Sequence, residues 1–491
     1  MRASLEGLES EIFKLVSSSA TPEQWAEWLR APLEHAAAEG NLDLVHKLVE
    51  AGATVIAGWK GCGGRTLLHA AAVGGNEGVL SALLRAGAQP DVNTLESPPS
   101  SLSPLYLATK CGHEAVARLL IKAGADVNFH EPKYAHTVLH EALWYKHDGL
   151  ATELMMNGAN VEALNSGNRT PLHFAAEKGL NGIVSALLLR GVDVDAVDGG
   201  GHSALIKASS GIGNGPHLAV VETLLAAGAD SNKITRDRQE TALHMAAYKG
   251  HVPIIKAIIQ SGAEVNSRDA TGMTALHRAA DDARSINALI EAGADIEVKC
   301  DRGWTPLAFA AVCGKANAML ALLQHGAIVD SRDNKQMTPL HTACFEKPED
   351  LVAVVDLLLQ WDADETALDE CYGETPEALL DNEDGDWFCT HDDLDHARLL
   401  LARAPAARAW RRRCWLVMLR SRASKARNAN CDIGSEGAGI RRHLVGKPAK
   451  VVRCDSSGGC LSGEIEILSG VVASLVGLGP EGVFRRIVSY L

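Results

Sequence analysis

Histidine is the residue type whose spacing in this sequence first suggests chemistry. Six histidines stand three residues after a threonine and recur along the chain: His69, His140, His173, His244, His277 and His341. Imidazole can bind a metal ion or transfer a proton near neutral pH. A metal centre needs several ligands around one point, whereas this regular spacing places the six histidines in successive structural units. We therefore predict that they have a structural role.

Two acidic stretches near the end of the chain suggest cation sites. In residues 381–386, aligning Gly385 with the glycine of a calcium loop puts Leu380 and His391 where carboxylates are needed. In residues 391–396, two histidines are five apart, which separates them on a helix, where a spacing of four would align them. We expect a solvated acidic surface in the first stretch and no zinc in the second.

Signatures of other catalytic chemistry are missing from the sequence. There is no glycine-rich phosphate loop followed by lysine and no Gly-x-Ser-x-Gly elbow. Cys454 and Cys460 lack the second cysteine pair that a zinc ribbon needs. We expect a protein that is not an enzyme and that uses no cofactor and no metal.

A repeat determines the elements that hold these residues. A phrase close to Thr-Pro-Leu-His-x-Ala-Ala returns about every 33 residues, with its clearest copies starting at Thr66, Thr170, Thr241, Thr274 and Thr338. Weaker copies start at Ala31, Ser103, Thr137, Ser203, Thr305 and Thr375. A second phrase, Leu-Leu-x-x-Gly-Ala, keeps the same period. Two motifs that share one period indicate a repeat solenoid.

One copy shows how each unit is expected to fold. Thr241 is placed to cap a short first helix, and Gly250 is placed to end it. Residues 251–260 form an apolar second helix that stops at Gly262, and residues 264–266 lead into an extended hairpin. Neither helix can bury its apolar face alone, so neighbouring copies must cover it.

These motifs resemble ankyrin repeats over residues 31–404. The resemblance implies an all-α solenoid of about ten to eleven helix–turn–helix repeats with hairpin fingers. It also implies that each motif histidine hydrogen-bonds its threonine and the adjoining loop backbone. Several copies depart from the pattern: Glu34, Tyr106, Ile206 and Ala308 replace the histidine, and Asp362 replaces the glycine of the second phrase. Residues 97–101 lengthen one finger, and the eleventh copy, at Thr375, is the weakest.

The flanking segments are predicted from composition. Residues 1–30 contain a capping box and fit an N-terminal helical cap. Residues 405–427 form a basic, aromatic helix, which either seals the open end of the stack or serves as a nuclear import signal, an anionic membrane contact or a partner helix. Residues 428–463 are a flexible Gly/Ser-rich linker, and residues 464–491 form an amphipathic helical segment. A less ordered C-terminal tail is therefore expected.

Charge and cysteine usage set further expectations. The net charge of −14 combines a body at −23 with a tail, residues 405–491, at +9. The strongly acidic body disfavours nucleic acid as a partner. The eleven cysteines have no paired spacing and no hydrophobic signal segment opens the chain, so we expect a cytoplasmic or nuclear location. The uncharged stretch 467–480 is too short to span a bilayer, and no transmembrane segment is predicted.

The resemblance implies a scaffold that binds partner proteins through finger tips and the concave face of the first helices. We expect a monomer. Aromatic residues and arginine dominate interface energies. The expected contact residues are Trp144, Tyr145, Phe174, Lys207, Met245, Tyr248, Arg268, Arg278, Arg302, Trp304, Phe309, Arg332 and Phe345. For Phe174 and Phe309 the alternative is packing against the next repeat, whereas Trp304 and Tyr248 are expected to matter for binding and little for folding.

A second function remains open. Residues 478–491 resemble the opening helix of an F-box, although the chain stops before the rest of that module and a glycine precedes the proline where leucine is usual. The alternative is therefore an adaptor that presents a captured protein to a ubiquitin ligase, with ligase subunits as additional partners.

Overall fold

The computed structural model describes residues 29–409, except 51–52, 54–59, 62–63, 212–216, 280–281, 371–372 and 382–388. It contains two compact units, Met1–Pro339 and Leu340–Leu491. Residues 1–28 of the predicted cap, residues 410–427 of the basic block, the linker 428–463 and the segment 464–491 lie outside the described residues. Most of the acidic stretch 381–386 does so too.

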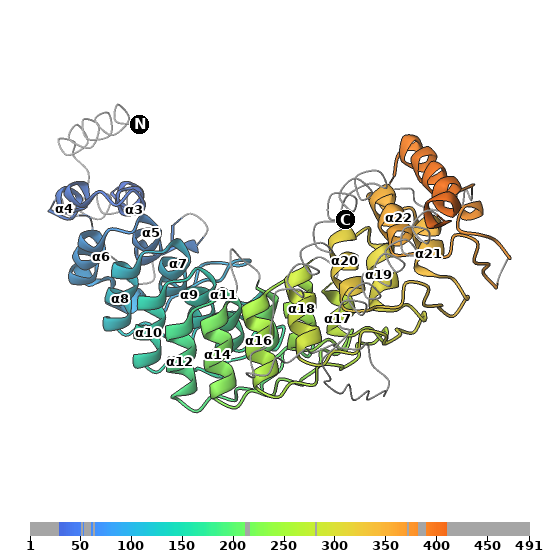
Figure 1. The fold of residues 1–491 in the computed structure, drawn as a ribbon. Helices are drawn as coiled ribbons and strands as arrows, with labels where there is room; N and C mark the ends of the chain where they lie inside the picture. Colours follow the sequence, from blue (N-terminus) through green and yellow to red (C-terminus); the bar gives the residue numbers. More distant parts are fainter. Residues whose placement is uncertain are drawn as a thin grey trace, which may run out of the picture. The chain divides into compact units, whose positions relative to one another are not determined.

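The first unit is a stack of helix pairs, with nine pairs among its described residues (Figure 1). The pairs are α3 (Arg30–Ala38) and α4 (Leu42–Glu50), α5 (Leu67–Gly74) and α6 (Glu77–Leu83), α7 (Pro104–Cys111) and α8 (Glu114–Lys122), α9 (Val138–Trp144) and α10 (Asp148–Met156), α11 (Pro171–Lys178) and α12 (Asn181–Leu188), α13 (Ala204–Ser210) and α14 (Leu218–Ala226), α15 (Ala242–Tyr248) and α16 (Val252–Gln260), α17 (Ala275–Arg278) and α18 (Ala283–Glu291), and α19 (Pro306–Val312) and α20 (Ala316–Gln324). A short π-helix, η2 (Leu84–Ala88), and a 3-10 helix, η3 (Gln89–Asp91), follow α6. The all-α prediction is confirmed.

Neighbouring pairs bury each other's apolar faces. First helices pack against first helices, from α3 through α5 to α19, and second helices form a parallel row from α4 to α20 (Figure 1). In α15, Leu243, Ala246 and Ala247 are buried, and in α16, Ile254 and Ile258 are buried. Because the partners of these side chains lie in adjacent copies, the stability of the stack is a sum over neighbours.

The sequence signals that start and stop the helices act as expected. Thr241 has the extended backbone of an N-cap, and its hydroxyl accepts the His244 N–H at 3.4 Å. Beyond the end of the same helix, Gly250 takes φ +69°, a left-handed conformation that glycine adopts without a Cβ clash.

Hairpin fingers connect the pairs. In one finger the Asp269 N–H donates to the Met273 carbonyl at 2.8 Å. Successive fingers are joined to each other by backbone hydrogen bonds, such as those from Gly199 N–H to Gly167 O and from Ala270 N–H to Arg238 O. The fingers therefore form a linked row, and a side chain on one finger has a fixed position relative to the next.

The second unit contains the last copies of the repeat. Helix α21 (Pro339–Glu346) continues into this unit and precedes α22 (Leu351–Gln360). Among its described residues, the eleventh copy has a 3-10 turn, η4 (Ala378–Asp381), where its first helix is expected, followed by a helix over residues 391–409.

Two acidic positions of the second unit have clear structural roles. Asp362 takes φ +70° in place of the motif glycine, a conformation that aspartate tolerates better than most residues. Arg408, the first arginine of the basic block, has its Nε 3.2 Å from Asp362 Oδ1 and also bonds Glu365. The beginning of the predicted basic helix 405–427 therefore contacts acidic residues that follow α22.

No described helix has the combination of length and apolarity that is needed to cross a bilayer.

Candidate partner-binding surface

The motif histidines join adjacent repeats. The Thr137 N–H donates to His140 Nδ1 at 3.2 Å, and His140 Nε2 lies 3.0 Å from the carbonyl of Arg169 in the next finger. Because Nδ1 accepts, the ring proton is on Nε2 and is donated to that carbonyl. The same pattern recurs at His69, His173, His244 and His277. The predicted hydrogen bonds are confirmed in these five copies.

Burial keeps these histidines neutral. It lowers the pKa of His140 to about 3 and the pKa values of His173 and His277 to about 4. Hydrogen bonds to the next finger oppose this shift but are outweighed by desolvation. Each ring serves as a neutral connector between two repeats. Among the described residues, no group of three or more His, Cys, Asp or Glu side chains is placed to hold a metal ion.

The expected contact residues fall into three groups by exposure. Six are exposed: Trp144, Tyr145, Tyr248, Arg268, Arg302 and Arg332. Five are partly buried: Lys207, Met245, Arg278, Phe309 and Phe345. Two are buried: Phe174 and Trp304.

The two buried aromatic residues belong to the core of the stack. Phe174 is 1% exposed, and its ring contacts the rings of His140 and Trp144 edge-on at centroid distances of 5.0 and 6.0 Å. Trp304 is 8% exposed, packs with Cys300, and donates its Nε1–H to Asp333 at 3.2 Å. The expectation that Trp304 matters little for folding is corrected by this packing, because removing the ring would leave a cavity.

Two of the partly buried cationic side chains form ion pairs within the chain. Lys207 Nζ lies 2.9 Å from Asp198 Oδ2. The Arg278 guanidinium lies 2.6 Å from Asp269 Oδ2 and 3.0 Å from Glu240 Oε1. These side chains are less available to a partner than the exposed arginines are.

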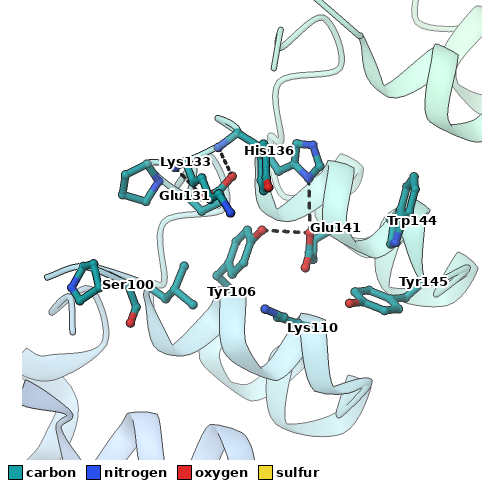
Figure 2. Close-up of a pocket in the computed structure, with 13 residues that line it drawn as sticks. Ser100, Tyr106, Lys110, Glu131, Lys133, His136, Glu141, Trp144 and Tyr145 are labelled. Carbon is teal, nitrogen blue, oxygen red and sulfur yellow. Dashed lines mark hydrogen bonds and ion pairs between the residues drawn. The ribbon is translucent and has the colours of Figure 1, made fainter. Parts of the chain in front are cut away.

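The exposed aromatic residues of the third and fourth copies surround a pocket (Figure 2). Its volume is about 560 Å³, and it lies between α7, α9 and the fingers that precede them. Its lining comprises Pro99, Ser100, Leu102, Tyr106, Lys110, Glu131, Pro132, Lys133, Tyr134, His136, Glu141, Trp144 and Tyr145. The lengthened finger supplies the first three of these residues.

A hydrogen-bonded pair holds Glu141 in the pocket. Tyr106, which replaces the motif histidine, donates its hydroxyl to Glu141 Oε2 at 2.9 Å (Figure 2). His136 Nδ1 lies 3.6 Å from the same oxygen. Burial, followed by the charge of Glu141, raises the pKa of Tyr106, so its hydroxyl remains a donor. The tyrosine thus fixes the carboxylate in one orientation.

Cations stack on the aromatic rings around the pocket. The Lys178 ammonium lies 3.5 Å from the centroid of the Trp144 ring, and Lys133 lies 4.7 Å from that of Tyr134. Tyr134 is 50% exposed, an unusual position for a large aromatic side chain. The surface therefore combines apolar area, ring faces that accept cations and buried carboxylates, which suits it to binding a peptide or protein segment.

The pocket was not predicted from the sequence, although two of its exposed residues, Trp144 and Tyr145, were among the expected contact residues. The missed members are on different elements, with Tyr106 on α7 and Tyr134 on a finger. A usable signal was present at Glu141, which carries an acid where two other copies carry Lys207 and Arg278.

The repeats match a family model and several known proteins. The family of ankyrin repeats (three copies) matches residues 33–131, 91–165, 139–235, 212–300 and 281–369. The chain is 33% identical over 154 residues to the nuclear factor NF-kappa-B p105 subunit of Gallus gallus, covering 30% of this chain and 15% of that protein. It is 27% identical over 331 residues to the E3 ubiquitin-protein ligase KEG of Arabidopsis thaliana, covering 56% and 19%. It is 31% identical over 249 residues to human ankyrin repeat and SOCS box protein 16, covering 50% and 46%. The chain thus spans less than half the length of each of these relatives.

Proposed function

The chain belongs to the ankyrin-repeat family, and from that premise we propose that it is a non-enzymatic scaffold that binds partner proteins through the first helices and fingers of its repeats. Ankyrin repeats are protein–protein interaction modules.

A cluster of exposed aromatic side chains indicates which surface of the repeats binds partner proteins. Tyr134, Trp144 and Tyr145 are exposed together around a single pocket between two fingers and two first helices. Large exposed aromatic side chains that cluster in this way mark interaction sites. The linked fingers and the histidine connectors hold these rings in place before a partner arrives, which reduces the entropy lost on association.

Site-specific photo-crosslinking in the native cell tests this assignment. A benzoylphenylalanine at position 145 should yield adducts with partner proteins, whereas the same residue at position 156 should not. Met156 is a matched control because it is highly exposed but lies at the end of a second helix, α10. Equal adduct yields at the two positions, or no adduct at position 145, would contradict the assignment.

A ubiquitin-ligase adaptor is the second candidate. It is favoured by the resemblance of residues 478–491 to an F-box opening and by the match of the repeats to an E3 ligase and to a SOCS box protein. Both matches come from repeats, and residues 478–491 lie outside the described part. Affinity capture with the full chain and with a chain lacking residues 464–491 tests this. Ligase subunits should be recovered with the full chain only, and their absence from both samples would leave the plain scaffold.

The proposal also covers the oligomeric state of the protein and its location in the cell. We expect the scaffold to act as a monomer. The unpaired spacing of the eleven cysteines favours a location in the cytoplasm or the nucleus. Light scattering of the purified chain and imaging of a tagged chain test these two statements. A stable dimer or an exclusively membrane-bound tag would refute them.

A further inference from the structure

Two repeats neutralise an acid of the finger with a base of the first helix. In the sixth copy Asp198, whose N–H closes the finger hairpin, pairs with Lys207. In the eighth copy Asp269, in the same role, pairs with Arg278. Lys207 and Arg278 share one position, directly after the motif histidine or its replacement. The repeat framework thus provides a place where a cation meets the finger carboxylate.

The fourth copy has an acid at both of these positions. Glu131 closes the finger hairpin by donating its N–H to the His136 carbonyl, and Glu141 follows the motif histidine. Both side chains line the pocket, and the residues are only 7% and 6% exposed. Among the described residues, no lysine or arginine lies within ion-pair distance of either carboxylate. The cation that the framework accommodates elsewhere is missing here.

The contacts that do reach these carboxylates leave the charge uncompensated. Glu131 accepts two backbone N–H groups, from Lys133 at 2.7 Å and from Tyr134 at 2.5 Å. Glu141 accepts the Tyr106 hydroxyl at 2.9 Å and lies 3.6 Å from His136. Buried carboxylates that are hydrogen-bonded but not paired with a cation attract any cation that can enter.

We propose that a basic side chain of a bound partner, arginine in preference to lysine, enters this pocket and supplies the missing cation between Glu131 and Glu141. The inference rests on the proposed scaffold function, because it assigns the chemistry of the partner at that surface.

The pocket walls favour a guanidinium. Arginine is planar, presents five donors and stacks on aromatic faces, so one guanidinium can meet a carboxylate and lie against a ring together. The chain contains such arginine–ring contacts internally: Arg169 lies over Phe174 at 4.3 Å and Arg302 over Trp304 at 4.8 Å. A volume of about 560 Å³ leaves room for such a side chain and its flanking backbone.

Two lysines of the lining do not take the place of the missing cation. Lys110 and Lys133 are exposed, and neither lies within ion-pair distance of the glutamates. Exposed ammonium groups are hydrated and screened by salt, whereas the buried carboxylates are screened much less. The pocket therefore attracts a cation at its base despite the lysines around it.

The substitution Glu141→Lys tests the inference, because it gives the fourth copy the pairing of the sixth. Lysine at this position is expected to pair with Glu131 as Lys207 pairs with Asp198, so the variant should fold with an unchanged or raised unfolding midpoint. Glu222→Lys is the matched control, since it makes the same charge change at an exposed position on α14.

The probe is a random twelve-residue peptide library displayed on phage and selected on the full wild-type chain. Selected peptides should share an arginine at one position. Replacing that arginine with norleucine should weaken binding at least tenfold, and replacing it with lysine should weaken it less. Glu141→Lys should bind the arginine peptide at least tenfold more weakly than wild type does, while Glu222→Lys should bind it within about twofold.

Three outcomes of the selection would contradict the proposed arginine site. Peptides with no shared basic residue, peptides that bind Glu141→Lys as well as wild type, or a selection that yields no peptide would overturn it. If Glu141→Lys fails to fold, Glu141→Gln keeps the shape and removes the charge, and unchanged peptide affinity for that variant would overturn the inference as well. Crosslinks at position 145 remain an independent readout, so the scaffold function can stand when this inference fails.

Discussion

Lowering the pH from 7 to 5 is expected to destabilise the repeats through their buried histidines. His140, His173 and His277 have no exposed surface, and burial lowers their pKa values to about 3, 4 and 4. The pKa of histidine in an unfolded chain is near 6.5. Between pH 7 and 5 the unfolded chain therefore takes up protons that the folded chain does not. The stability that these groups contribute is present above the unfolded pKa and is lost as the pH falls toward the folded values.

The size of the effect follows from proton linkage. Each of the three histidines should lower the free energy of unfolding by about 2 kcal/mol over this interval, and together they should lower it by about 6 kcal/mol. Aspartate and glutamate contribute little above pH 5, because their pKa values in an unfolded chain lie near 4. The change in the free energy of unfolding between pH 7 and 5 therefore comes mainly from the histidines.

Urea unfolding followed by circular dichroism at pH 7, 6 and 5 measures the change. His173→Gln should reduce the change in the free energy of unfolding between pH 7 and 5 by about 2 kcal/mol, because it removes one of these contributions. His325→Gln should leave it unchanged, since His325 is exposed. An unfolding midpoint that does not move between pH 7 and 5 would refute the reasoning, as would folded-state imidazole NMR signals of these histidines that titrate near 6.5.

Three other substitutions separate core residues from surface residues by urea unfolding. Trp304→Ala should lower the free energy of unfolding by about 3 kcal/mol, because a buried ring is removed; a loss below about 1 kcal/mol would place the ring on the surface. Tyr248→Ala should change it by less than about 0.5 kcal/mol, since the side chain is exposed, and a larger loss would show that it packs. Asp198→Asn should lower it by about 2 kcal/mol, because Lys207 keeps its charge without its partner. Adding Lys207→Met should restore part of that loss, and no restoration would argue against the ion pair.

The stack was predictable from the sequence because its determinants are local. Thr241 caps a helix and Gly250 permits a left-handed turn through interactions within a few residues of each, so a motif repeated at one period repeats the same structure. Where the motif weakens, the prediction weakens with it. Among the described residues, the copy that starts at Thr375 forms the 3-10 turn η4 in place of a first helix, and Glu377 and Ala378 stand where the motif has leucine and histidine.

The site was harder to predict because aromatic residues stabilise both cores and interfaces. Phe174 and Trp144 are equally plausible contact residues by type, yet Phe174 packs beneath Trp144 and His140 while Trp144 reaches solvent. Which way a side chain of the first helix faces depends on the size of its neighbours in the adjacent copy. The pocket requires Tyr106, Glu141 and a lengthened finger to meet, and no single segment of sequence contains that combination.

A chain of similar repeats separates the requirements of folding from those of binding. The position after the motif histidine holds Glu141, Phe174, Lys207, Met245 or Arg278 in successive copies, and all five copies fold alike, so the framework does not require an acid there. Two buried carboxylates without a cation weaken folding relative to an acid–base pair, because neither charge is neutralised. A partner cation that enters the pocket would neutralise these charges, and the free energy gained appears as binding. A bound arginine peptide should therefore raise the unfolding midpoint of the wild-type chain, more at low salt than at high salt, and should leave the midpoint of Glu141→Lys where it was.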